Sequence, residues 1–370
     1  MKRLTFSKLA LISAAFAACQ VASAAPLHEV IQMGNRPGFE NGLPMAINNK
    51  NFVVGNSYTN TINSPWLFSE ATGLQGLGFD GFHEFYMRDI NSSQRMSGFS
   101  KGWQSAVRGQ AGSMSEWGDL NGYAKTEAWG LNDAGAMVGW ATTANALERA
   151  TRFNVNFTHT LLPVLDISKN SRARRVNYAG FAVGSSDDKA VLWTANNTLV
   201  NLHAMLPGAV KSFATDINEA GWVTGYVQNG SGASKGFRFN FETGISLFDP
   251  IEEDEYVVPR AINLHGNTVG MTRRTEFAGQ VEAFINMGGV NSISLNSLID
   301  ANSGWFLSEA MDINDNGYIV GRGTFQGIDT TYMLKPVPEP ASIMAIGVGL
   351  GYLSRRTRPR QSRLDARSAK

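Results

Sequence analysis

The sequence predicts an all-β fold, a seven-bladed β-propeller, and three observations support this prediction. First, a nine-residue phrase that begins with an aliphatic residue and Asn and ends with Gly recurs seven times. Second, successive copies begin 41 to 51 residues apart, near the about 40 to 50 residues of one four-stranded blade. Third, the last copy lacks a fourth strand, while a strand-like segment upstream of the first has no partner. Seven such units form a closed ring.

We call the aliphatic first residue of each phrase its anchor. The seven anchors are Ile47, Ile90, Leu131, Val176, Ile217, Ile262 and Ile313. Four residues after the anchor, five copies have Gly, and the first two copies have Asn51 and Gln94. A type I turn followed by a left-handed residue favours Gly there, with Asn next best tolerated. The Asn after the anchor can accept hydrogen bonds from the turn backbone. Each phrase therefore predicts a strand, a tight turn and a second strand.

Three residues before each anchor the side chain is mostly small, which suits an innermost strand near a crowded axis. These residues are Pro44, Met87, Ala128, Ala173, Ala214, Pro259 and Ala310.

Two further strands follow each phrase. Apolar runs such as 190–193, 236–239 and 283–286 predict the third strand. Segments after polar turns, such as 198–200 and 290–293, predict the fourth. The seventh unit ends without a fourth strand, so we expect residues 28–32 to complete the last blade and remove two exposed sheet edges.

Composition agrees with a globular all-β domain, because the chain is 43% hydrophobic and 10% aromatic and has 39 Gly. About 310 residues in one ring provide an ample core.

The N-terminal segment is predicted to be a secretory signal peptide. Three basic residues precede an apolar run over 9–18, and an Ala-x-Ala cleavage pattern follows at 22–24. Pro26 forbids cleavage after Ala25, so we expect maturation after Ala24.

The single cysteine, Cys19, lies inside this segment. A lipoprotein would carry Cys19 as its modified first residue, but residues 16–18 form a poor lipobox. The main interpretation is an exported protein that folds without disulfides.

The C-terminal segment has the order of a sorting signal. Pro338-Glu339-Pro340 precedes an uncharged run over 341–353, and Arg355 and Arg356 follow. Thirteen apolar residues span about 20 Å as a helix, less than a hydrocarbon core of about 30 Å. The arginines would hold the C-terminal end in the cytoplasm.

This arrangement resembles the PEP-CTERM sorting signal of Gram-negative bacteria, although the apolar run is short and the tail over 357–370 is long. The resemblance implies recognition by an exosortase, transient insertion in the inner membrane, cleavage near the Pro-Glu-Pro motif, and release to the cell surface or exopolysaccharide matrix. An ordinary C-terminal helix with a basic cap is the alternative.

The predicted organisation is a signal peptide over 1–24, a propeller over 25–335, a sorting signal with its hydrophobic segment over 336–356 and a basic tail over 357–370.

The repeats resemble the extracellular HAF-type repeat, which has the pattern Ile-Asn-Asp-x-Gly-x-x-Val-Gly followed by a Phe-Leu-Trp strand. The copies at 130–139 and 312–321 match best, and the resemblance covers nearly all of 40–335. It implies a fold and an extracellular location, and it carries no established activity.

Charge argues against a nucleic-acid partner. Without residues 1–24 and 341–370 the chain keeps 22 basic and 30 acidic residues, a net charge near −8. A protein that neutralises phosphates needs the opposite sign.

Three local motifs look chemical, and each has a simpler structural interpretation. Residues 232–236 match G-x-S-x-G but lie in a Gly/Ser loop before a strand, where a nucleophile elbow needs a helix. Residues 76–81 match G-x-G-x-x-G with no helix to receive a phosphate, which favours an inter-blade loop. Residues 312–317 begin like a calcium loop, but the twelfth position is Gly323, which favours a hairpin turn.

No catalytic, cofactor or metal residues are predicted. The five histidines lie on different units without close pairing: His28, His83, His159, His203 and His265. Two charge runs remain. The acidic run 252–255 is interpreted as a solvated loop, with a cation or basic-partner patch as the alternative. Arg172, Arg174 and Arg175 on the fourth inner strand face either an anionic glycan or solvent.

The first functional hypothesis is an exported, monomeric and non-catalytic binding or structural module whose partners are exopolysaccharide or other surface proteins. Loops between units are short except for 288–303, which argues against the second hypothesis, an enzyme acting on extracellular glycan. The third is a lectin-like adhesin. It requires exposed tryptophans at equivalent points, and the candidates are Trp129, Trp140, Trp193 and Trp222, which inter-blade packing explains equally well.

Overall fold

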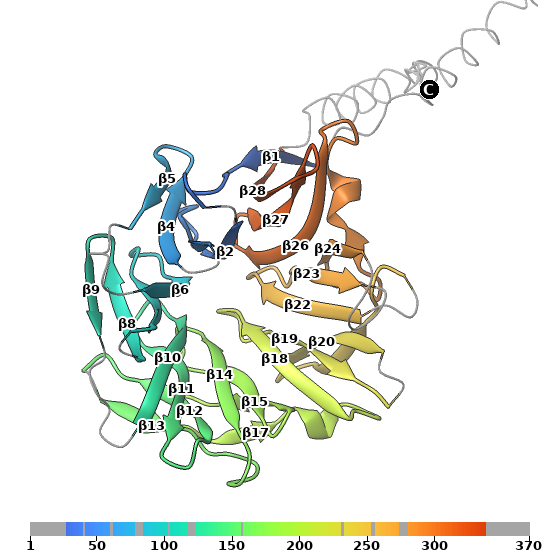
Figure 1. Cartoon of the computed structure of the whole chain (residues 1–370). Helices are drawn as coiled ribbons and strands as arrows, with labels where there is room; N and C mark the ends of the chain where they lie inside the picture. The colour runs from blue at the N-terminus through green and yellow to red at the C-terminus, as the bar shows by residue number, and fades with distance from the viewer. Residues whose placement is uncertain are drawn as a thin grey trace, which may run out of the picture. The chain divides into compact units, whose positions relative to one another are not determined.

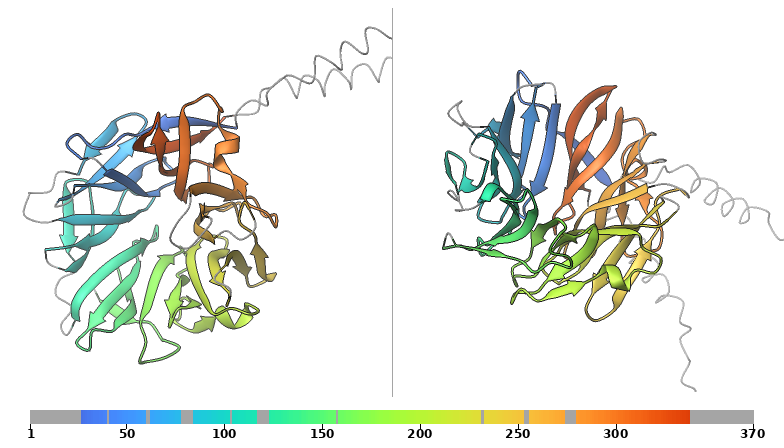
Figure 2. Two further views of the ribbon diagram at one scale, coloured as in Figure 1. Left: turned by 45° about the vertical axis from the view of Figure 1, so that its right-hand side comes forward. Right: turned by 60° about the horizontal axis from the view of Figure 1, so that its bottom comes forward.

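The computed structural model describes residues 27–337 apart from 40, 60–61, 78–83, 103, 117–122, 157, 231–232, 253–255 and 274–279. These residues form seven four-stranded sheets arranged around one axis (Figure 1 and Figure 2). The predicted all-β seven-bladed propeller is therefore confirmed. No helix in this part of the chain is long and apolar enough to cross a membrane.

The expected sorting helix and signal residues lie outside the described residues: Ala24, Ala25, Pro338, Glu339, Pro340, Arg355 and Arg356.

We number the blades in chain order and name the strands of each from the axis outward. Blade one contains β2 (Asn41–Ile47), β3 (Val53–Tyr58), β4 (Asn63–Ser69) and β5 (Gly73–Gly76). Blade two contains β6 (Phe85–Ile90), β7 (Met96–Ser100), β8 (Ser105–Gln110) and β9 (Ser113–Glu116). Blade three contains β10 (Tyr123–Leu131), β11 (Met137–Thr143), β12 (Glu148–Phe153) and β13 (His159–Leu161). Blade four contains β14 (Ser171–Val176), β15 (Ala182–Ser186), β16 (Lys189–Trp193) and β17 (Leu199–Asn201).

Blade five contains β18 (Lys211–Ile217), β19 (Val223–Gln228), β20 (Ser234–Asn240) and β21 (Gly244–Phe248). Blade six contains β22 (Tyr256–Ile262), β23 (Thr268–Arg273), β24 (Val281–Asn286) and β25 (Ile293–Ser294). Blade seven contains β26 (Trp305–Ile313), β27 (Ile319–Phe325), β28 (Ile328–Pro336) and β1 (His28–Gln32). Two short 3-10 helices, η1 (His203–Met205) and η2 (Leu295–Leu298), complete these elements.

The N-terminal strand closes the ring as predicted. β1 pairs antiparallel with β28, in a register that runs from His28 opposite Pro336 to Gln32 opposite Tyr332. Blade seven therefore combines both ends of the described chain.

The turns of the seven phrases also agree with the prediction. The residue four after each anchor has a φ between 59° and 85°, including Asn51 and Gln94. The Asn after each anchor accepts a hydrogen bond through its side-chain oxygen from the backbone N–H four residues later, in all seven blades.

The same seven asparagines form a closed ring between blades, which we call the Asn ring. It consists of Asn48, Asn91, Asn132, Asn177, Asn218, Asn263 and Asn314, all of them buried. Each side-chain nitrogen donates to the backbone carbonyl of the Asn in the next blade, over 2.6 to 3.2 Å. The bond from Asn314 to Asn48, of 3.0 Å, completes the ring. Every junction between blades thus carries one buried hydrogen bond of the same kind.

Each innermost strand has a β-bulge at the residue two before its anchor, where the pairing with the second strand skips one position. A bulge redirects a side chain away from the regular alternation of a strand. The bulge also explains the final Gly of the phrase. A Cβ on Gly139 would lie 1.8 Å from the backbone oxygen of Glu127, and one on Gly321 would lie 2.0 Å from that of Glu309.

The hydrophobic core lies between neighbouring blades. One cluster, for example, joins Val183 and Leu192 of blade four to Ile217 and Phe237 of blade five. Five of the seven residues three before the anchors belong to these inter-blade clusters: Met87, Ala128, Ala173, Ala214 and Ala310. They lie on the innermost strands, as expected, and the bulge presents the next residue to the axis.

The predicted fourth strand of blade six also needs correction. Residues 290–293 were expected to form it, but β25 begins only at Ile293. The backbone of Val290 and Ser292 instead bonds to Asp249 of blade five. The buried Asn286 holds this loop by donating to the carbonyl oxygens of Gly289 and Asn291.

Candidate anion-binding site on the propeller axis

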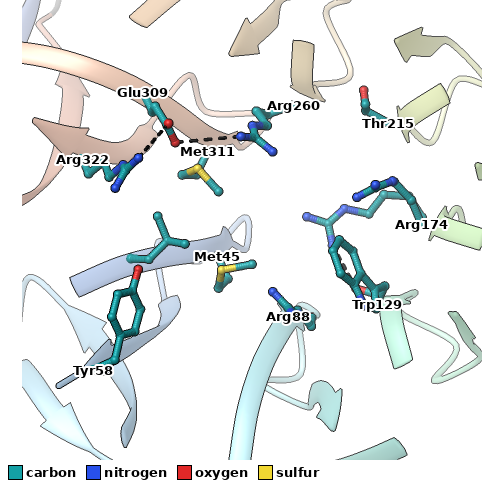
Figure 3. A pocket seen from close by; sticks show the side chains of 12 residues that line it. Met45, Tyr58, Arg88, Trp129, Arg174, Thr215, Arg260, Glu309, Met311 and Arg322 are labelled. Atoms are coloured by element: carbon teal, nitrogen blue, oxygen red, sulfur yellow. Dashed lines mark hydrogen bonds and ion pairs between the residues drawn. The ribbon is translucent and has the colours of Figure 1, made fainter. Parts of the chain in front are cut away.

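The seven bulge residues together line a cavity on the axis, with a volume of about 390 Å³. They are Met45, Arg88, Trp129, Arg174, Thr215, Arg260 and Met311. Figure 3 shows their side chains converging from all seven blades. Leu43, Tyr58, Glu309 and Arg322 also line its wall, and Arg175 lines its floor. Each blade therefore contributes the side chain of its bulge residue to one shared cavity, and the residue type at that position varies between blades.

The side wall of this axial cavity is strongly basic. Arg88, Arg174, Arg260 and Arg322 line it, and Glu309 is the acidic residue that lines it with them. Glu309 is buried, lies 2.9 Å from the Arg322 guanidinium and 3.9 Å from that of Arg260 (Figure 3). One carboxylate thus faces two of the four arginines.

The other two arginines are held by an aromatic ring. The guanidinium carbons of Arg88 and Arg174 lie 4.4 Å and 4.8 Å from the ring centroid of Trp129. The indole N–H donates to Glu127 over 3.0 Å, which fixes the ring. A cation–π contact orients a guanidinium through its face and leaves its N–H donors free for other partners.

Within the described residues, neither Arg88 nor Arg174 makes an ion pair with a carboxylate. The buried Nε–H groups of Arg88 and Arg260 have no hydrogen-bond acceptor there. Burial lowers the pKa of Arg88, and it lowers the pKa of Arg174 to about 10. Both groups remain protonated at neutral pH. Glu127 favours the charged form of Arg88 without forming an ion pair with it. The cavity therefore holds half-buried positive charge and two unused Nε–H donors, which an anion would satisfy.

The floor of the cavity is a charged layer formed by the residues next to the anchors. Arg175 lies 3.0 Å from Asp89 and 3.7 Å from Asp216, and Asp312 is the third carboxylate of the layer. Each Asp accepts a hydrogen bond of 2.8 Å from the backbone N–H of the anchor in the next blade. Arg175 also lines a depression of about 170 Å³ beside the Asn ring, so this layer separates the two spaces.

Three carboxylates surround the single guanidinium of Arg175, so negative groups outnumber the positive one, and the pKa values of the carboxylates are raised. Burial raises the pKa of Asp89, and it raises the pKa of Asp216 to about 6 and that of Asp312 to about 7, against the opposing effect of Arg175. Burial acts to lower the pKa of Arg175, but the three carboxylates outweigh it and raise that pKa. Arg175 therefore stays charged, while Asp216 and Asp312 gain protons as the pH falls from neutral to mildly acidic.

The structure separates the three arginines of the run that the sequence singled out. Arg172 turns away to Glu148, whose Oε1 lies 2.7 Å from its guanidinium, and it stacks over Trp140. The Arg174 side chain enters the cavity, and Arg175 belongs to its floor. The bulge between Ala173 and Arg175 causes this separation.

Sequence reasoning missed Arg88, Arg260, Arg322 and Glu309. Alignment of the seven copies at the position two before the anchor would have grouped Arg88, Trp129, Arg174 and Arg260. Glu309 and Arg322 lie at other positions, and no sequence signal indicates that they meet the axis.

The other sequence candidates are not brought to one place. Ser234 of the G-x-S-x-G match is buried in β20 and bonds to the backbone of Val257, while Gly232 lies outside the described residues. Of the G-x-G-x-x-G match, residues 78–81 also lie outside them. Asp312 and Asn314 belong to the floor and to the Asn ring, and Gly317 forms the predicted hairpin turn.

The histidines remain apart. His28 lies in β1, His159 in β13, His203 in η1 and His265 in a turn, whereas His83 lies outside the described residues, as do 253–255 of the acidic run. No group of three His, Cys, Asp or Glu in the described residues has a geometry that could hold a metal ion.

The tryptophans do not provide equivalent exposed points. Trp193 and Trp140 are buried, Trp222 is partly buried in the turn of blade five, and Trp129 lines the cavity.

Comparison with solved structures confirms the fold. A streptogramin B lyase matches with a TM-score of 0.56 and 12% identity, covering 84% of this chain and 98% of that one. A catalytically inactive virginiamycin B lyase from Staphylococcus aureus, solved with quinupristin, matches with the same TM-score and identity and is covered completely. No protein-family model and no curated protein matches the sequence. At this identity the likeness extends to the fold alone.

Proposed function

We propose that the protein is an exported, non-catalytic binding module that holds an anionic ligand in its axial cavity. The observation that carries the proposal is the pair Arg88 and Arg174, two half-buried cations that line the cavity, neither of which forms an ion pair with a carboxylate of the described residues. A half-buried charge without a close counter-ion costs free energy, and perturbed charges of this kind cluster at functional sites. The predicted mature domain has a net negative charge, so the positive charge of the cavity is confined to the axis and does not reflect the composition of the whole domain.

The predicted signals supply the location. The signal peptide and the sorting segment support export and display at the surface of a Gram-negative cell after exosortase processing. A monomer acting at the surface or in the exopolysaccharide matrix meets acidic sugars as abundant anions. The alternative of a glycan-acting enzyme receives no support from the cavity, whose side wall combines four arginines with one acid. The lectin-like adhesin, in the predicted form with exposed tryptophans at equivalent points of several blades, receives none from the tryptophans.

Isothermal titration calorimetry with glucuronate, galacturonate, sulfate and neutral glucose tests the binding site. We expect the anions to bind and glucose to give no heat. Arg88→Gln and Arg174→Gln should each weaken binding by about tenfold or more, since a charge-assisted hydrogen bond contributes about 1.5–3 kcal/mol. Arg95→Gln, a matched loss of charge in an exposed turn of blade two, should bind as the parent does. Equal binding of glucose, or equal losses in all three variants, would contradict the proposal.

The sorting proposal is tested by mass spectrometry of the protein released from cells that contain an exosortase. A mature form that begins at Ala25 and ends near Pro338 is expected. A released form that keeps residues 341–370 would contradict it.

A further inference from the structure

A second cavity adjoins the axial one between blades seven and one. Its volume is about 270 Å³, and it shares Tyr58, Glu309 and Arg322 with the axial cavity. The two cavities therefore meet at the Glu309–Arg322 ion pair. Figure 3 shows Tyr58 and Arg322 on the same side of the axial cavity as Glu309.

The two partners of this ion pair differ in freedom. Glu309 is 9% exposed at its side chain, whereas Arg322 is 51% exposed. The backbone oxygen of Glu309 also accepts a hydrogen bond of 2.9 Å from the buried Tyr332 hydroxyl. Glu309 is thus fixed and has a second cation in Arg260, while Arg322 is free to turn toward solvent or toward a ligand. A ligand that extends from the axial cavity past the Glu309–Arg322 ion pair can displace Arg322, because Glu309 keeps Arg260 as a nearby cation.

The chemistry of the second cavity differs from that of the first. Beyond the shared residues its side chains are mainly amides and hydroxyls, those of Asn35, Asn41, Ser308 and Thr330, with Val281 as the aliphatic side chain and Asp329 as a further acid. Amides and hydroxyls both donate and accept hydrogen bonds, as sugar hydroxyls do. A peptide or lipid would require more apolar lining. A neutral, hydroxyl-rich group fits this cavity best.

We infer that the two cavities form one groove for an acidic oligosaccharide. Its acidic group lies with Arg88 and Arg174 on the axis, and the neighbouring neutral sugar lies in the cavity between blades seven and one. This inference rests on the proposed anion site and adds the size and class of its ligand. It also assigns Tyr58 and Arg322 to both sugar positions, because they line both cavities.

The test compares three ligands by calorimetry on the parent protein: glucuronate, a disaccharide of glucuronate linked to a neutral hexose, and an acidic dipeptide. The disaccharide should bind about tenfold or more tightly than glucuronate. In Asn41→Trp, which fills the second cavity from an exposed position on β2, the disaccharide should lose this gain while glucuronate binds unchanged. Lys50→Trp, in the exposed turn after β2, is the control. Thermal unfolding of each variant checks that it folds.

Equal affinity for glucuronate and the disaccharide in the parent protein would overturn the inference and leave the axial site intact. So would equal losses for both ligands in Asn41→Trp, or a dipeptide that binds as tightly as the disaccharide. Absence of glucuronate binding would refute the proposed function itself, and the inference with it.

Discussion

Arg174 is a residue whose charge lowers the stability of the folded protein and at the same time provides a contact for an anionic ligand. The side chain is half-buried, with its guanidinium against Trp129, and burial lowers its pKa to about 10 without removing its charge at neutral pH. A charge held in this way costs free energy in the folded state, and this cost falls when a ligand supplies the missing anion.

Replacement of Arg174 by Met should therefore stabilise the protein and weaken anion binding. Met keeps much of the packing on Trp129 and removes the buried charge, so the free energy of unfolding should rise by about 1 kcal/mol. Urea unfolding measures the first effect, and calorimetry with glucuronate the second. A variant that is both less stable and unable to bind would indicate that Arg174 has a structural role instead.

The floor carboxylates predict a dependence of stability on pH. The pKa of Asp312 is about 7 in the folded state and about 3.9 in the unfolded chain. Between these values the folded state holds more protons than the unfolded state, so the free energy of unfolding falls as pH rises from about 4 to about 7. Asp216, with a folded pKa of about 6, acts in the same direction.

Asp312→Asn isolates this contribution. The variant cannot ionise at this position, so its free energy of unfolding should decline less steeply than that of the parent between pH 5 and pH 7. The slope is the relevant quantity, because the hydrogen-bond changes at Ile47 and Ile313 do not depend on pH. Denaturant unfolding at several pH values measures it, and parallel slopes in parent and variant would refute the assignment.

At the scale of the element, one phrase encodes a turn, a bulge and a contribution to the cavity. Its final Gly lies opposite the bulge, where the backbone oxygen of the innermost strand leaves no space for a side chain. The bulge in turn directs the residue two before the anchor into the axial cavity. The final Gly recurs in all seven phrases because the bulge needs it, and the bulge in turn places one side chain of each blade in the axial cavity.

Gly139→Ala should disturb both properties. Its Cβ would meet the Glu127 oxygen at 1.8 Å, so the bulge that carries Trp129 must shift. We expect a loss of about 1–3 kcal/mol in unfolding free energy and weaker anion binding, since Trp129 positions Arg88 and Arg174. Gly289→Ala, where no atom lies within 4 Å of the new Cβ, is the control. Unchanged stability in Gly139→Ala would show that the strand pair adapts without cost.

Local patterns predicted the turns and strands well, because the left-handed position four after each anchor and the alternating strands are properties of neighbouring residues. Even Asn51 and Gln94 follow that rule. The bulge was not predicted, because it depends on pairing between strands and leaves no mark in the composition of one strand. This is why Arg172, Arg174 and Arg175, which looked like one charge run, have three different environments.

At the scale of the molecule, the Asn ring links all seven blades. The sequence indicated that each Asn holds its own turn, but it could not indicate that the side-chain nitrogen reaches the next blade, since that contact exists only when the ring is closed. The same holds for the axial cavity, whose wall draws on residues from every blade.

Asn218→Asp should reveal the energy of one junction. The carboxylate still accepts from the Trp222 N–H, but its second oxygen would face the carbonyl of Asn263, to which the amide now donates over 2.6 Å. Two buried acceptors in contact should cost about 1–3 kcal/mol. Thermal unfolding measures the effect, and Asn196→Asp in an exposed turn is the control. Equal midpoints for the two variants would show that the ring bond is dispensable.

The pairing of β1 with β28 decides how the propeller responds to mechanical force. The last described strand, β28, is clamped on one side by β27 and on the other by β1. A pull on the C-terminal side of the chain therefore loads a strand in shear between two neighbours, and many hydrogen bonds must break together before the blade opens. The N-terminal strand lies at the outer edge of the blade and is held on one side only, by β28. The strand that precedes the predicted sorting segment is thus paired on both sides.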